Sequence, residues 1–335
     1  MVPPKPFQIL RLPFVPLQEV LRAMDPFELI NFSMISKRAK AVTKQITFYS
    51  TYSIQLSIDD QFELWVVVPR YMTSCFYKFT SNVEMNGKVK KIDWNDRNEL
   101  FTWKYSDKPG EEWKQLCKHV LEIFKKRTID VLLMTMDSVV DQNVWIIDFL
   151  KSNAKSVSEC DLFQSKQNND VEEDAAYFLN NITINSKLFF KLNIKNENFH
   201  GKIPKNLEEL NIRNSQWIGY DKLLKIDCKS VILNRNRISD DQWNLFIKKW
   251  IAMETHSNLE LLELDYRELD NFRDCVLHDI PLEEIDGGIK RVLKTCRDKN
   301  IEINGGIDIR RIDGKTATFF AKRTFWKQYL AMSIH

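Results

Sequence analysis

The spacing of apolar residues changes twice along this chain, and these changes restrict its fold more than any other feature. Apolar side chains recur at helical spacing in residues 6–44, most clearly in 17–24. Between residues 52 and 103 the period falls to two, which is typical of strands with one buried face. Beyond residue 109, helical stripes alternate with short apolar runs. The chain is therefore predicted to be mixed α/β, with successive segments at 7–46, 47–108 and 109–335.

Three helices are expected in the first segment. Pro16 can begin the first, Asp25-Pro26 supplies an N-cap and a first-turn proline for the second, and Ser36 can cap a third, basic one. The second helix is apolar on more than one side, and a unit of about 40 residues is too small to bury such a helix alone. Part of this surface is therefore expected to contact a partner.

The second segment is predicted to be a small antiparallel sheet. Asn86-Gly87 is a strong hairpin signal, with 88–94 as the returning strand and 100–105 as the next one. Its tryptophans are expected to pack in a core rather than to stack on a ligand: Trp65, Trp94 and Trp103.

Leucine-type positions repeat in the third segment and predict stacked αβ units. After an expected strand at 188–194, strands begin every 20 to 30 residues from residue 207, as in irregular leucine-rich repeats. Such units align their strands in a parallel sheet that keeps one face open. The leucine-type positions of these strands are Leu207, Leu210, Ile212, Val231, Leu233, Leu259, Leu262 and Leu264.

Residues near the buried positions of these strands are expected to point out of the sheet. They combine both charges with amides, which suits a protein target better than a polyanion. The alternative is that they only keep the face soluble. The predicted target-binding residues are Lys191, Asn193, Lys195, Glu209, Asn211, Arg213, Ser230, Asn234, Glu263 and Asp265.

Motifs for catalysis and metal binding are missing from the sequence. It has no G-x-S-x-G, Walker, G-x-G-x-x-G or H-E-x-x-H motif, and its five histidines are scattered. Six cysteines form no C-x-x-C pair, which favours reduced thiols in a cytoplasmic or nuclear protein. With neither a signal peptide nor a membrane-length apolar run, no membrane partner is expected. No enzyme activity, cofactor or metal site is predicted.

The charge is nearly balanced, at +3 overall. Short basic runs near aromatic residues make nucleic acid a competing partner, but each has acids nearby, which favours a solvated surface. These basic residues are Lys88, Lys90, Lys91, Lys125, Lys126, Arg127, Lys248, Lys249, Arg310 and Arg311.

The first segment resembles an F-box, the motif through which ubiquitin-ligase adaptors bind the Skp linker of a cullin complex. The resemblance rests on Leu12-Pro13, on 20–24 in the first helix, on Asp25-Pro26, and on 29–30 and 35–38 in and after the second. Ala39 stands where many F-boxes have tryptophan. The residues that the resemblance assigns to Skp-linker binding are Leu12, Pro13, Leu17, Val20, Leu21, Met24, Pro26, Leu29, Ile30 and Ile35.

Residues 207–263 are similar to the type 2 F-box-associated domain, which follows an F-box in a family expanded in nematodes. The similarity is marked by Trp217, by 223–228, by the polar turn at 237–241 and by 246–250. Together the two resemblances imply a non-catalytic substrate receptor of an SCF ubiquitin ligase. Its partners would be the Skp linker, through it a cullin and a RING protein, and a target protein.

Two expectations follow for the docking segment. Residues 1–46 carry seven basic and three acidic side chains, which suits the acidic character typical of Skp linkers. Changing Leu12, Leu21 and Leu29 to Asp is expected to abolish docking. The alternative is a degenerate F-box on a repeat scaffold that works without a ligase, or on a nucleic-acid-binding protein.

Overall fold

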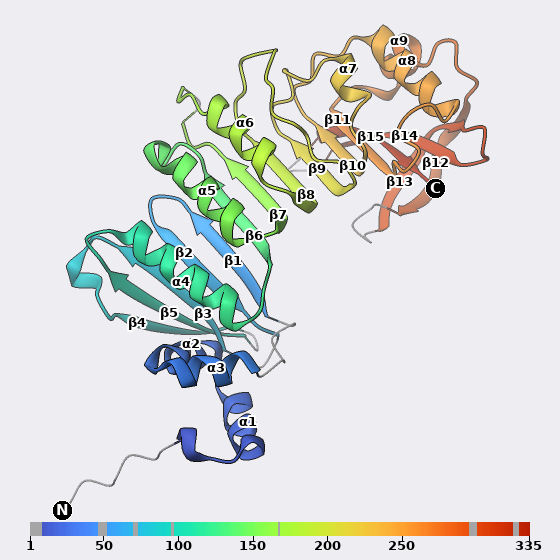
Figure 1. Ribbon diagram of the computed structural model, residues 1–335. Coiled ribbons are helices and arrows are strands. Elements are labelled where there is room, and N and C mark those ends of the chain that lie inside the picture. Colours follow the sequence, from blue (N-terminus) through green and yellow to red (C-terminus); the bar gives the residue numbers. More distant parts are fainter. Residues whose placement is uncertain are drawn as a thin grey trace, which may run out of the picture. The chain divides into compact units, whose positions relative to one another are not determined.

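A computed structural model describes residues 9–45, 52–69, 73–94, 97–166, 168–294, 300–323 and 328–335 (Figure 1). The chain divides into two units, each taken by itself below. Unit 1 comprises Met1–Met134 and Asp148–Val157, and unit 2 comprises Thr135–Ile147 and Ser158–His335. Unit 1 therefore holds the first two predicted segments and the first helix and strand of the third. The mixed α/β class is confirmed.

Unit 1 begins with the three expected helices, preceded by a 3-10 turn at Ile9–Arg11. They are α1 (Phe14–Ala23), α2 (Pro26–Ile35) and α3 (Lys37–Gln45). At the start of α2, Glu28 N–H donates to Asp25 Oδ1 at 2.8 Å and Asp25 N–H donates to Glu28 Oε2 at 3.0 Å. This reciprocal cap satisfies two backbone donors that the helix itself cannot. Ser36 Oγ accepts the Ala39 N–H at 3.0 Å and so caps α3 as expected.

The remainder of unit 1 is a sheet in the order β6-β1-β2-β3-β5-β4, with one helix, α4 (Pro109–Ile123), against it (Figure 1). Trp113 of α4 donates its indole N–H to the Glu63 carbonyl at 3.1 Å and fixes the helix on β2. The strands are β1 (Ser53–Ile58), β2 (Phe62–Val67), β3 (Thr73–Thr80), β4 (Val89–Trp94), β5 (Arg97–Tyr105) and β6 (Thr128–Thr135).

The predicted hairpin at Asn86-Gly87 is wrong. β3 pairs with β5 in parallel, and β4 lies on the far side of β5, antiparallel to it. A 3-10 turn at Val83–Met85 separates β3 from the Asn-Gly pair, so the chain leaves the sheet before it turns. Gly87 has a positive φ of 70° and donates its N–H to Trp103 on β5 at 3.1 Å. The turn therefore delivers β4 to β5 and not back to β3.

Unit 2 contains the expected parallel sheet, in the order β12-β13-β14-β15-β11-β10-β9-β8-β7. Strands β8 to β11 pair in parallel, whereas β15 joins β11 antiparallel and was not predicted. The strands are β7 (Ser156–Phe163), β8 (Ile184–Lys191), β9 (Leu207–Ile212), β10 (Cys228–Leu233), β11 (Leu261–Asp265), β12 (Glu283–Lys294), β13 (Asn300–Arg310), β14 (Thr316–Arg323) and β15 (Gln328–Ile334).

Helices cover one face of this sheet (Figure 1). They are α6 (Glu172–Asn181), α7 (Tyr220–Leu223), α8 (Asp240–Ile251) and α9 (Leu269–Val276), while α5 (Asn143–Asn153) is shared between the two units. Ser239 and Gln242 cap α8 reciprocally, and its Trp243 and Phe246 are buried. Within the described ranges, no helix combines the length and apolar character that crossing a bilayer requires.

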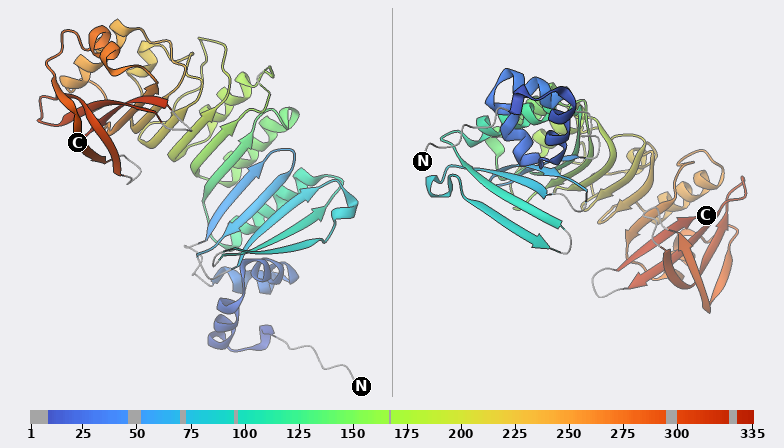
Figure 2. Two further views of the ribbon diagram at one scale, coloured as in Figure 1. Left: turned by 180° about the vertical axis from the view of Figure 1, so that it is seen from behind. Right: turned by 90° about the horizontal axis from the view of Figure 1, so that it is seen from below.

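The opposite face of the sheet is closed at one end. The long β12–β13 hairpin curls over β11, β14 and β15 (Figure 2). Its Leu293 and Ile303 pack against side chains of all three strands: Leu261, Phe320 and Ala331. The open face expected from the sequence is therefore confined to β7–β9, because Ser230 and Ile232 on the same face of β10 are also buried.

Strand β8 begins and ends earlier than predicted, at 184–191 instead of 188–194. Beyond Lys191 the backbone N–H groups donate to side-chain oxygens and not to the backbone of a neighbouring strand. Gln164 Oε1 accepts the Asn193 N–H at 2.9 Å, and Glu172 Oε1 accepts the Lys195 N–H at 2.6 Å. The buried Leu192 and Ile194, which made the sequence look like strand, pack without a ladder.

Candidate partner-binding surfaces

The ten residues assigned to Skp-linker binding differ widely in exposure. Leu12, Val20 and Met24 are half-buried, and Pro13 and Ile35 are exposed. Their contact with a linker stays a prediction. Five of the ten belong to the core of the chain itself: Leu17, Leu21, Pro26, Leu29 and Ile30.

The rest of unit 1 covers the buried side of helix α2. It contacts β3 and α4, and the Phe27 ring stacks on Tyr77 with 5.9 Å between ring centroids. The chain therefore covers part of the apolar surface that the sequence assigned to a partner. Replacing Leu21 or Leu29 by Asp would consequently disturb folding before it tested docking.

A buried polar contact also joins α2 to α4. The Ser33 hydroxyl donates to the Ile30 carbonyl at 2.7 Å, so its oxygen accepts from His119 Nε2, 2.6 Å away. Burial lowers the pKa of His119, with a further contribution from the Lys40 charge. His119 is thus held neutral in a structural contact.

Two of the basic residues in the first segment are paired within unit 1. Lys40 and Lys44 of α3 bind Glu122 of α4 at 2.6 Å and 3.0 Å. Their hydrogen bonds lower the pKa of Glu122 to about 2. The basic excess available to a partner is therefore smaller than the sequence indicated.

Four described apolar residues of this segment stay exposed at two helix ends, and we call them the junction patch: Phe14, Val15, Met34 and Ile35. All four are exposed apolar side chains, at the start of α1 and the end of α2. Arg38 Nη2, just after α2, donates to the Leu10 carbonyl at 2.9 Å and ties the segment before α1 to this junction. Phe14, Val15 and Met34 were not among the residues predicted from the sequence, although the first two directly follow Leu12-Pro13.

Ala39, the departure from the usual F-box tryptophan, is completely buried. Its carbonyl accepts the Thr43 hydroxyl at 2.9 Å, and Lys40 beside it reaches α4. A tryptophan would have to displace these neighbours, because closely packed sites tolerate added volume poorly. The small residue fits a helix that packs on its own chain.

The predicted target-binding residues of unit 2 lie on the face opposite the helices where they belong to strands. Glu209 is in register with Ser230, and Ile232 is in register with Glu263. Contrary to expectation, Glu209, Ser230 and Glu263 are buried. Asn211 and Asp265 are half-buried on this face, while Asn234 follows β10 and gives its carbonyl to Ser215. Asn193 and Lys195 lie beyond the end of β8, off the sheet.

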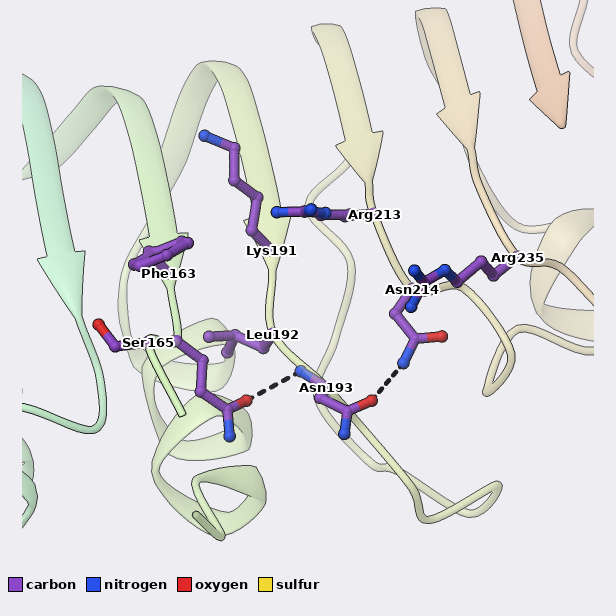
Figure 3. A pocket seen from close by; sticks show the side chains of 9 residues that line it. Phe163, Ser165, Lys191, Leu192, Asn193, Arg213, Asn214 and Arg235 are labelled. Atoms are coloured by element: carbon purple, nitrogen blue, oxygen red, sulfur yellow. Dashed lines mark hydrogen bonds between the residues drawn. The ribbon is translucent and has the colours of Figure 1, made fainter. Parts of the chain in front are cut away.

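Three predicted residues meet in a pocket of about 160 Å³ where β7–β10 end: Lys191, Asn193 and Arg213. Figure 3 shows the side chains gathered there, with Asn193 held between Gln164 and Asn214. The other lining residues, which the sequence analysis missed, are Phe163, Gln164, Ser165, Leu192, Asn214 and Arg235. The sequence held one signal for this pocket, because basic residues recur there at an interval of 22 residues: Lys191, Arg213 and Arg235.

Two family models match the chain, one in each unit. Residues 9–51 match the F-box domain, and residues 198–264 match the F-box associated family. This chain is an F-box protein with an F-box-associated domain. Two proteins of Caenorhabditis elegans are similar to it. "Skn-1 dependent zygotic transcript 15 protein" is 23% identical over 345 residues, covering 93% of each chain. The second is 20% identical over 335 residues, covering 95% of this chain and 76% of the relative. No solved structure matches significantly.

The two matches overlap the two candidate surfaces of this F-box protein. The F-box match contains α1–α3 and the junction patch, and the second match contains β9, β10 and most of β11, with Arg213, Asn214 and Arg235. F-box domains typically bind the Skp linker within SCF complexes, and proteins with both domains are generally non-catalytic adaptors.

Four of the ten residues in the basic runs of this F-box protein are paired within the chain. Lys126, Lys248 and Lys249 form ion pairs with nearby acids. The Arg311 side chain is buried, binds Asp313 at 2.7 Å and lies over the Trp250 ring. In the part of the chain that the structure describes, no cluster of His, Cys, Asp and Glu could hold a metal ion.

Proposed function

We propose that this F-box protein is the substrate-recognition adaptor of an SCF ubiquitin ligase. Helices α1–α3 dock on the Skp linker, which connects the protein to a cullin and a RING protein, and unit 2 captures a target protein. The observation that carries the proposal is the junction patch, an exposed apolar surface inside the F-box match of a chain that also holds the F-box-associated match.

An adaptor of this kind contributes position and not chemistry. Holding a target beside the ligase raises its effective concentration near the charged conjugating enzyme. It also orients target lysines for transfer. We propose that the protein acts in the cytoplasm or nucleus, where thiols stay reduced. Five described cysteines are free thiols: Cys75, Cys117, Cys160, Cys228 and Cys275.

Exposed residues of the junction patch provide the sharpest test. Val15 is 66% and Ile35 is 74% exposed, so Val15→Glu with Ile35→Glu puts two charges on the surface without entering the core. We expect the double variant to lose co-purification with the Skp linker, since desolvating a charge at an apolar contact is costly. Val83→Glu is the matched control, because Val83 lies in unit 1 outside the F-box and is 63% exposed.

Equal recovery of the linker by the double variant and the control would contradict docking through this patch. Recovery of RNA or DNA in place of a cullin and the linker would contradict the adaptor function itself. A thermal melt of each variant, expected to match that of the unaltered protein, shows that any loss is not caused by unfolding.

A further inference from the structure

Three basic residues occupy the ends of successive parallel strands in unit 2. Lys191 ends β8, while Arg213 and Arg235 closely follow β9 and β10. Neighbouring strands lie about 4.8 Å apart, so basic residues at equivalent positions of successive strands place their charges close together at one edge of the sheet. All three line the same pocket (Figure 3).

The backbone at Arg235 is specialised. Arg235 has a positive φ of 55°, a conformation that residues with a side chain seldom adopt. Asp265 Oδ2 accepts the Arg235 N–H at 2.5 Å and holds the turn. Four other described non-glycine residues share this conformation, so it fixes the place of Arg235 and does not by itself mark a site. Here it accompanies an arginine that lines a pocket.

The charges in the pocket are not balanced. Lys191 Nζ lies 2.6 Å from Asp161 Oδ2, so its charge is compensated. Arg213 and Arg235 form no side-chain hydrogen bond or ion pair with any described residue. No acidic residue is among the nine that line the pocket. Two exposed guanidinium groups without an ion-pair partner in the described chain therefore line it, and the nearest acid to Arg235 is Asp265, which binds its backbone N–H.

Polar groups surround these cations. Asn193 and Asn214 are joined through their side chains, and Gln164 is anchored on the Asn193 backbone. The exposed Ser165 also lines the pocket, and its hydroxyl can donate a hydrogen bond. The pocket thus offers two planar cationic forks, the Asn214 amide and the Ser165 hydroxyl, donors suited to a compact oxyanion. The Gln164 amide only braces the pocket, because its N–H groups donate to the Lys166 and Asn169 carbonyls.

We propose that this pocket binds the phosphoryl group of a phosphorylated serine or threonine on the target protein. The assignment of this phosphoryl group to a target protein rests on the proposed adaptor function. A phosphate monoester carries about −1.5 to −2 charges at neutral pH, which two unpaired guanidinium groups match. A single carboxylate would compensate only one of them.

The surroundings favour a single anion over a nucleic-acid backbone. Among the described residues, Glu159, Asp161 and Glu209 share this face with the pocket, and its further cation, Lys187, is paired with Glu159, so unpaired cations do not continue along it. A nucleic acid needs a row of phosphate contacts. The larger pocket of about 500 Å³, beside Trp217, is different because its Lys222 ammonium is already bound by three backbone carbonyls.

The test is a calorimetric titration of the full chain with O-phosphoserine at constant ionic strength. We expect Arg213→Gln and Arg235→Gln each to weaken binding about tenfold, because each loses charged hydrogen bonds, and the double variant to abolish it. Arg237→Gln is the matched control. Arg237 is two residues from Arg235, exposed, and bound to Glu197 outside the pocket; its variant should bind as the unaltered protein does.

Two further measurements address the charge. Asp161→Asn frees the Lys191 charge for the pocket and should tighten binding several-fold. Because the second pKa of a phosphate monoester is about 6, affinity for O-phosphoserine should fall between pH 7.5 and 5.5. Sulfate keeps its charge over this range and should show no such fall.

Several outcomes would overturn the proposal. These are equal binding by the double variant and the Arg237→Gln control, acetate binding as tightly as O-phosphoserine, or much tighter binding of a single-stranded RNA oligonucleotide that the double variant loses. Failure of the adaptor function is separable, because the Val15→Glu, Ile35→Glu variant should retain O-phosphoserine binding whether or not it loses the Skp linker.

Discussion

In unit 2, the sheet face opposite the helices is apolar and covered at one end, and charged and uncovered at the other. At β11, β14 and β15 the face carries Leu261, Phe320 and Ala331, and the β12–β13 hairpin covers them. At β7 and β8 it carries acids and lysines that pair across the strands, with 2.6 Å between Lys187 and Glu159 and between Lys191 and Asp161. The covered end has an apolar core, and the uncovered end has charges that stay near water. One sheet can thus be rigidly closed at one end and available for binding at the other.

The boundary between the two ends lies at β10 and β11. Ser230 is buried beside Leu261, and Glu263 is buried beside Ala331. Polar groups at these positions limit how far the apolar cluster extends along the face. The contrast between the two ends makes four predictions about stability.

The largest effect is expected from a charge in the covered end. Ile303 is 7% exposed in β13, and Ile303→Asp should lower the free energy of unfolding by about 4 kcal/mol or more, because the carboxylate has no partner in the cluster. Chemical denaturation measures this loss. Ile312→Asp is the control, since Ile312 is 71% exposed after the same strand; equal losses in both variants would show that the hairpin does not cover the face.

A smaller loss is expected from the ion pair that holds the hairpin. Arg291 on β12 binds both carboxylate oxygens of Asp308 at 2.8 Å and 2.9 Å, and Thr318 donates to the same carboxylate at 2.7 Å. Arg291→Met should cost about 2–3 kcal/mol, because it leaves a largely buried charge with one partner. Denaturation of Arg291→Met beside the double variant Arg291→Met, Asp308→Asn measures it, and the second change should restore part of the loss.

The same pair sets a pH dependence. Burial alone would raise the pKa of Asp308, but hydrogen bonds from Arg291 and Thr318 hold it below its usual value. The carboxylate therefore stabilises the fold above pH of about 4, and this contribution disappears as pH falls through the lowered pKa. In Arg291→Met the loss should begin at higher pH. Unchanged acid unfolding in that variant would contradict the assignment.

The smallest effect is expected at the open end. Lys187 and Glu159 are both about one-third or more exposed, so Lys187→Met should change stability by less than about 1 kcal/mol, and by less still at high salt. Denaturation at two salt concentrations measures it. A loss as large as that of Arg291→Met would show that this end of the face is closed too.

Local features of the fold could be predicted from the sequence. Asp25 with Glu28, and Ser239 with Gln242, mark helix starts because a cap uses residues three positions apart. The alternation of buried and outward-pointing residues located β9, β10 and β11, because it too depends only on residues close together in the sequence. The Asn86-Gly87 turn was also recognised locally, but which strand it serves depends on β5, which comes later in the chain.

Features that depend on distant residues could not be predicted. β15 enters between β11 and β14, a choice that no local pattern specifies. Leu29 and Ile30 were assigned to docking because the sequence alone does not show that α4 and β3 cover the helix that carries them. The pocket was found in part, because Lys191 and Arg213 were assigned to the open face, but Arg235 required the turn held by Asp265.

The interleaving of the two units has a consequence for biosynthesis. Unit 1 is completed by Asp148–Val157, which the ribosome makes only after Thr135–Ile147 of unit 2. Helices α1–α3 therefore emerge long before their unit is complete, roughly ten seconds at translation rates of about 5–20 residues per second. The apolar sides of α2 are covered only once β3 and α4 have been made, so nascent chains stalled before residue 123 should be the form most in need of chaperones.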